Sequence, residues 1–172
     1  LYTNNLLLFD PSWFNHENES SHFLREKLME QLLEKKTRYL GATHLFLDFL
    51  EFGGNVHFRT INTALIETYF LQNKPILTGL NSTYLYNCPR DWFYNQGKAL
   101  PDDTRGTPCG HFVVLHGYDT EKKQIVVADP YSKNPLSKGH YYTVSPDRLI
   151  NAIMLGVGTY DGNLLIIEPK KT

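Results

Sequence analysis

Residues 110–119 read GHFVVLHGYD, and residues 124–130 read QIVVADP. Both stretches are rich in β-branched and aromatic side chains, which favours strands. The residues that separate them are polar and few, as in the loop of a hairpin, and we expect this loop at residues 118–122. The two stretches therefore predict an antiparallel hairpin, and the rest of the chain is interpreted outward from it.

The hydrophobic residues of the hairpin suggest its register. If Val113 faces Val127, His111 lies directly opposite Asp129 on the same face of the sheet. Directly opposed residues have Cβ atoms about 4.5–5.5 Å apart, which is close enough for an imidazole–carboxylate hydrogen bond. Such a carboxylate fixes the tautomer and orientation of a histidine that acts as a general base. The alternative is that His111 ends a strand and that Asp129 with Pro130 only begins a turn.

Hydrophobic spacing and capping residues predict helices first and strands afterwards. Helices are predicted after the capping pair Ser20 and Ser21 and at residues 37–52, 60–72 and 146–155; further strands are predicted at 75–80, 140–144 and 163–168. Residues 87–108 are rich in Pro, Gly, Asp and Asn, so we expect a long surface loop with one short helix. This order is typical of an α+β protein and differs from alternating βαβ units.

Composition limits the class of protein. The chain has 172 residues, 41% of them hydrophobic, and a formal charge of −1. The balanced charge argues against a nucleic-acid partner, and no apolar run approaches the roughly 20 residues of a membrane span. Two cysteines exclude a disulfide framework and a four-cysteine zinc site, and so few thiols indicate a reducing compartment such as the cytoplasm. We expect no bound metal and no cofactor.

The histidine and aspartate stretches resemble the corresponding strands of the C39-like cysteine peptidases, which have a papain-like fold. The matching segments are residues 111–119, 126–131, 74–80, 140–142, 147–150 and 156–169. The resemblance implies an α+β, papain-like domain over residues 1–172, in which helices pack on an antiparallel sheet. Residues 1–73 would be mostly helical, and residues 74–172 would form the sheet lobe. The resemblance also implies a Cys-His-Asp triad, with His111 as the base and Asp129 as the orienting carboxylate.

The cysteine of that triad has no counterpart in this sequence. The family's nucleophile begins a helix in a Cys-Gly-Pro-like motif, where the helix dipole and a nearby imidazolium lower the pKa of the thiol. The cysteines of this chain are Cys88, a candidate cap of a short helix, and Cys109, which precedes His111 by two residues. We expect both to be ordinary thiols, and we expect the nucleophile to come from a segment preceding Leu1.

These features predict a cysteine peptidase or amidase domain that acts on a peptide or amide bond. The alternative is a catalytically inactive peptide-binding or regulatory module. The expected partners are the substrate and an upstream segment of the same protein, and a groove left by an absent lobe predicts a homodimer. Tyr84, which follows the predicted strand at residues 75–80, is expected either to line the cleft or to belong to the core.

Overall fold

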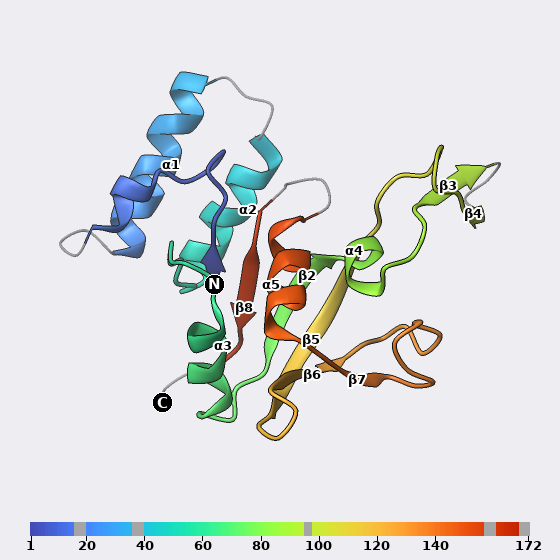
Figure 1. Ribbon diagram of the computed structural model, residues 1–172. Coiled ribbons are helices and arrows are strands. Elements are labelled where there is room, and N and C mark those ends of the chain that lie inside the picture. The colour runs from blue at the N-terminus through green and yellow to red at the C-terminus, as the bar shows by residue number, and fades with distance from the viewer. Residues whose placement is uncertain (16–19, 36–39, 95–97, 157–160, 169–172) are drawn as a thin grey trace. The chain divides into compact units, whose positions relative to one another are not determined.

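The computed structural model describes residues 1–15, 20–35, 40–94, 98–156 and 161–168. The chain divides into two compact units, Leu1–Thr60 and Ile61–Thr172. The first unit is mainly helical, and the second contains an antiparallel sheet with its own helices (Figure 1).

The first unit begins with a short strand and continues into two helices. Its elements are β1 (Tyr2–Thr3), the 3₁₀ helix η1 (Pro11–Phe14), α1 (Ser21–Lys35) and α2 (Leu40–Glu51). The Oγ atom of Ser20 accepts a hydrogen bond from the N–H of Phe23 at 3.1 Å, which confirms the predicted cap. Gly53 follows α2 with a φ angle of 88°, a conformation that favours glycine. The predicted start of the second helix, residues 37–39, lies outside the described residues.

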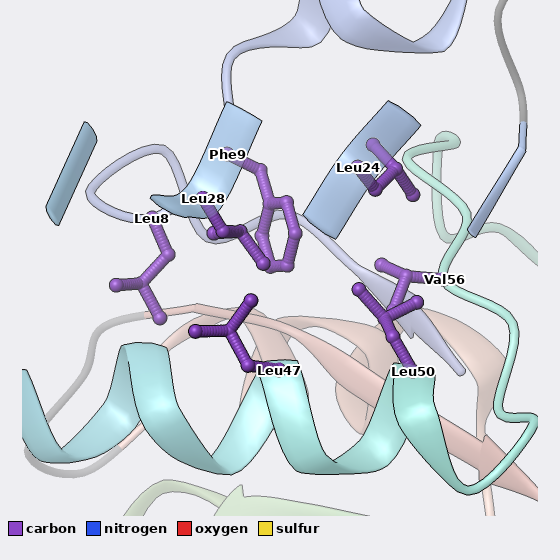
Figure 2. Packing of buried hydrophobic residues seen from close by; sticks show 7 residues of the cluster. All are labelled: Leu8, Phe9, Leu24, Leu28, Leu47, Leu50 and Val56. Carbon is purple, nitrogen blue, oxygen red and sulfur yellow. The ribbon is translucent and has the colours of Figure 1, made fainter. Parts of the chain in front are cut away.

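The core of the first unit joins both helices to the segments beside them. Figure 2 shows its buried side chains, Leu8, Phe9, Leu24, Leu28, Leu47, Leu50 and Val56. Each helix contributes two leucines three or four positions apart, so that both lie on one face of the helix. This spacing is the periodicity from which the two helices were predicted.

The sheet of the second unit contains the predicted hairpin at its centre. Its strands are β2 (Ile76–Asn81), β5 (Gly110–Asp119), β6 (Gln124–Ala128), β7 (Tyr141–Val144) and β8 (Asn163–Ile166). Within this unit they follow the order β8-β2-β5-β6-β7, and every neighbouring pair is antiparallel. Each of these strands was predicted from the sequence to within a few residues at its ends.

Helices cover the face of the sheet to which Val113 and Leu115 point. The helices of this unit are α3 (Thr63–Phe70), α4 (Ser82–Tyr86) and α5 (Pro146–Met154). Helix α5 contacts β2, and helix α3 contacts β5. Val113 and Leu115 are buried, whereas Phe112, on the opposite face, is 68% exposed. His111 shares the face of Val113, because side chains alternate along a strand.

The predicted register of the β5–β6 hairpin is wrong by two residues. Leu115 pairs with Val127, where the prediction paired Val113 with Val127. The register then shifts at His116, where a β-bulge adds one residue to β5, and the turn occupies residues 120–123. Up to the bulge, this displacement of two residues keeps the side chains of β5, His111 among them, on their predicted face, because the side-chain period of a strand is two.

The prediction of a long loop with a short helix at residues 87–108 is also wrong. Strands β3 (Asp91–Tyr94) and β4 (Lys98–Pro101) form an antiparallel hairpin, which Figure 1 shows away from the larger sheet. The short helix lies earlier, as α4, and no helix occurs among the described residues from 88 to 108. The ring of Trp92 packs 3.8 Å from the guanidinium carbon of Arg105, a contact that a local propensity argument does not include.

We predict that the second unit depends on the contact of α5 with the sheet. Leu149 is fully buried on α5, so Leu149→Ala should lower the free energy of unfolding by about 2–5 kcal/mol. Leu155→Ala, at the exposed end of the same helix, is the matched control and should change it little. Urea denaturation followed by circular dichroism measures both, and equal losses in the two variants would contradict this packing.

Candidate active site

His111 and Asp129 contact each other directly. The Nε2 atom of His111 lies 2.8 Å from the Oδ1 atom of Asp129. His111 is the second residue of β5, and Asp129 directly follows β6. Extending the observed register by one residue places Asp129 beside Val113. His111 is therefore the diagonal neighbour of Asp129, a separation that a long side chain can span.

The carboxylate of Asp129 is buried and accepts four hydrogen bonds. Its Oδ1 atom accepts from the N–H of Tyr131 at 2.7 Å as well as from His111, and its Oδ2 atom accepts from the hydroxyls of Tyr86 at 2.6 Å and Tyr142 at 2.9 Å. Burial alone would raise the pKa of Asp129, but these donors outweigh it and lower the pKa below its usual value. The carboxyl group is therefore ionised at neutral pH.

An ionised Asp129 determines which nitrogen of His111 carries a proton. A carboxylate only accepts hydrogen bonds, so Nε2 must donate. In a neutral imidazole the other nitrogen, Nδ1, then has its lone pair available for a proton. No described residue forms a hydrogen bond with Nδ1. The His111 side chain is 24% exposed, so this nitrogen belongs to a partly accessible group and has a lone pair that can accept a proton.

A pocket of about 270 Å³ adjoins His111. Its lining residues come from β2, β5 and the segments around β8: Gly79, Leu80, Gly110, His111, Phe112, Gly156, Asp161 and Asn163. Asp161 is buried, and its Oδ2 atom accepts a hydrogen bond from the side-chain amide of Asn163 at 3.0 Å. Its Oδ1 atom has no donor among the described residues. The pocket therefore combines an imidazole with a carboxylate that has remaining hydrogen-bonding capacity.

The family model of the Peptidase_C39 like family matches residues 27–150, which include His111, Asp129 and most of the sheet. The chain belongs to this family. No curated protein and no solved structure gave a match. Membership in the C39-like family agrees with the helices and antiparallel sheet described above, so the predicted α+β, papain-like fold is confirmed.

Neither thiol of this C39-like chain has the surroundings of an activated nucleophile. Cys88 follows the left-handed Asn87 that ends α4, so the expectation that it caps the start of a helix is wrong. Burial, and then the nearby carboxylate of Asp91, raise its pKa. The Sγ atom of Cys109 donates to Asp91 at 3.0 Å, and burial, followed by this contact, raises the pKa of Cys109 to about 11. Both thiols are therefore protonated at neutral pH.

Sequence reasoning missed the two tyrosines that contact Asp129. Tyr142 lies on the inward face of β7, and its alternation with the exposed Tyr141 was the available signal. Tyr86 belongs to α4, a helix that was not predicted. Tyr84, the tyrosine singled out in this segment, is 38% exposed and packs against Arg148 instead.

The described residues offer no candidate metal site. They contain no group of three or more His, Cys, Asp or Glu side chains that could hold a metal ion. None of their helices combines the length and the apolar character that crossing a membrane requires.

We predict that alkylation of Cys109 is slow at neutral pH and accelerates with pH. The thiolate is the reactive form, and it becomes the major form only above a pKa of about 11. The rate constant for iodoacetamide, measured by mass spectrometry in the Cys88→Ser variant, should therefore rise tenfold per pH unit between pH 7 and 10. Asp91→Asn removes the carboxylate and should move the profile to lower pH. A rate that is independent of pH in this range would refute the assignment.

Proposed function

We propose that this domain supplies the general base and the orienting carboxylate of a cysteine peptidase or amidase site, and that the thiol comes from outside these 172 residues. The observation that carries the proposal is the 2.8 Å contact between His111 and Asp129 beside the pocket. The lone pair of Nδ1 is on the side of the imidazole that Asp129 does not occupy. Membership in the peptidase family supports the same reaction class.

The proposed reaction uses the imidazole twice. Nδ1 of His111 takes the proton of the thiol, and the thiolate forms a bond to the carbonyl carbon of the substrate. The resulting imidazolium is stabilised by Asp129 and returns its proton to the departing amine when the C–N bond breaks. Water then attacks the carbonyl carbon of the thioester and gives a proton to Nδ1. The C–S bond breaks and releases the acid, and the imidazolium returns the proton to the sulfur, which restores the thiol.

The surroundings of Cys88 and Cys109 favour a thiol from outside the chain, because neither of these two thiols lies where a thiolate is stabilised. A thiolate needs positive potential, such as a helix N-terminus or an imidazolium, to form at neutral pH. Cys109 instead donates to the Asp91 carboxylate, and Cys88 stands after the C-terminus of α4. Burial, and then the nearby carboxylate of Asp91, raise the pKa of both thiols, because each disfavours the ionised form.

We predict that the intact native protein hydrolyses amide bonds and that this activity depends on His111 and Asp129. Its sequence is first determined by mass spectrometry of the native product, and its turnover of fluorogenic peptide amides is then measured. His111→Ala should lower kcat by about 10²–10⁴-fold, and Asp129→Ala should also lower it. Cys88→Ser and Cys109→Ser, the matched controls for a thiol, should retain activity.

Three results would contradict this proposal. Turnover that survives His111→Ala would remove the base from the mechanism. Peptide binding without any turnover in the intact protein would favour the alternative, a catalytically inactive peptide-binding or regulatory module. Loss of turnover in Cys109→Ser, with the fold retained, would place the nucleophile inside this chain.

A further inference from the structure

Two tyrosine hydroxyls from different elements meet at a single oxygen atom. Tyr86 of α4 and Tyr142 of β7 both donate to the Oδ2 atom of Asp129, at 2.6 Å and 2.9 Å. We call these two residues the hydroxyl clamp. The other oxygen of Asp129, Oδ1, accepts hydrogen bonds from His111 and from the backbone N–H of Tyr131. Each oxygen of the carboxylate therefore has its own pair of donors.

The four donors use the full capacity of the carboxylate. An ionised carboxylate offers about four lone-pair sites on its two oxygens. All four are filled, so a proton added to Asp129 must displace one of the donors. Rotation of the carboxylate away from its position would break these bonds in a site where Asp129 is buried, which makes rotation unfavourable. The contacts thus limit both the protonation and the orientation of Asp129.

Neutral donors suit an aspartate that must stabilise an imidazolium. Among the described residues, no lysine or arginine forms an ion pair with Asp129, and its one side-chain partner that can carry a positive charge is His111. A cation on Oδ2 would stabilise the carboxylate but would also repel a protonated His111. Tyrosine hydroxyls stabilise the carboxylate without adding charge, so the attraction between Asp129 and the imidazolium is retained.

The clamp hydroxyls keep their protons over the whole physiological range. Burial, followed by the hydrogen bond to Asp129, raises the pKa of Tyr86 above its ordinary value. The same two causes, in the same order, raise the pKa of Tyr142. Both hydroxyls therefore remain donors wherever Asp129 is ionised.

We propose that Tyr86 and Tyr142 are positioning residues, which hold the carboxylate of Asp129 in place through its Oδ2 atom and keep its Oδ1 atom directed at His111. The catalytic consequence rests on the proposed function, whereas the effect on Asp129 does not. The groups that face Asp129 are His111 from β5, Tyr86 from α4, Tyr142 from β7 and the Tyr131 N–H from the segment after β6. The ring of His140 forms a hydrogen bond with the backbone carbonyl of Asp129, at 2.8 Å, rather than with its carboxylate.

We predict that removing either clamp hydroxyl raises the pKa of Asp129. The experiment follows the ¹³C resonance of the Asp129 carboxyl during a pH titration of this 172-residue chain, in Tyr86→Phe, Tyr142→Phe and the double variant. The titration midpoint should rise by about one pH unit for each hydroxyl removed, because each donor favours the ionised form. In the same samples, the ¹⁵N resonances of His111 should show a protonated Nε2, the nitrogen that donates to Asp129.

Tyr141→Phe is the matched control. Tyr141 is the neighbour of Tyr142 in β7 but is 65% exposed on the opposite face, so its loss should leave the Asp129 midpoint unchanged. A midpoint in both clamp variants that equals that of the control would overturn the proposal. If Tyr142→Phe fails to fold, Tyr86→Phe decides, because Tyr86 is only half-buried on a short helix.

The titration of Asp129 tests the hydroxyl clamp independently of the turnover assay, which tests the proposed function. The titration needs neither thiol nor substrate, so a shifted midpoint supports the clamp even if the intact protein hydrolyses nothing. Conversely, turnover that depends on His111, together with an unshifted midpoint, would retain the enzyme proposal and remove the clamp. In an active intact protein, the clamp variants should lower kcat more than they change KM.

Discussion

The buried carboxylate of Asp129 is the interaction on which the described site depends. A charge removed from water is stable only when hydrogen bonds replace its hydration. Here the replacements come from α4, β5, β7 and the segment that follows β6. These elements are far apart in the sequence, so satisfying one side chain requires the hairpin, β7 and α4 to be assembled together. The same requirement fixes the imidazole of His111.

The contact between His111 and Asp129 was predicted correctly, although the register from which it was predicted is wrong by two residues. The reason is geometric. Hydrophobic alternation specifies the face on which each residue of a strand lies, but it does not distinguish registers that differ by two residues. The choice between such registers depended on the bulge at His116 and on the turn at residues 120–123, neither of which alternation encodes. His111 and Asp129 consequently became diagonal neighbours, and the reach of the imidazole spans the difference.

The parts that the sequence did not predict depend on contacts between distant residues. The helices α1, α2, α3 and α5 follow from periodicity and caps, such as the Ser145 side chain that accepts from the N–H of Arg148. Helix α4 has five residues, too few for a periodic pattern, and its position depends on contacts with β2, β5 and α5. Tyr86 was missed for this reason. The strands β3 and β4 were not predicted because their stability comes partly from Trp92 packing on Arg105, a contact that sequence patterns do not include.

The charges around Asp129 and His111 limit the kind of nucleophile that the proposed reaction could use. The described residues stabilise a negative carboxylate with neutral donors, and that carboxylate in turn favours a positive imidazole. A thiolate is stabilised by the same imidazolium, but it is destabilised by a carboxylate that contacts it directly. Cys109 has such a carboxylate, Asp91, at 3.0 Å. A nucleophile compatible with this arrangement must approach His111 from the Nδ1 side, with the imidazole between the sulfur and Asp129, so that the imidazolium separates the two negative charges.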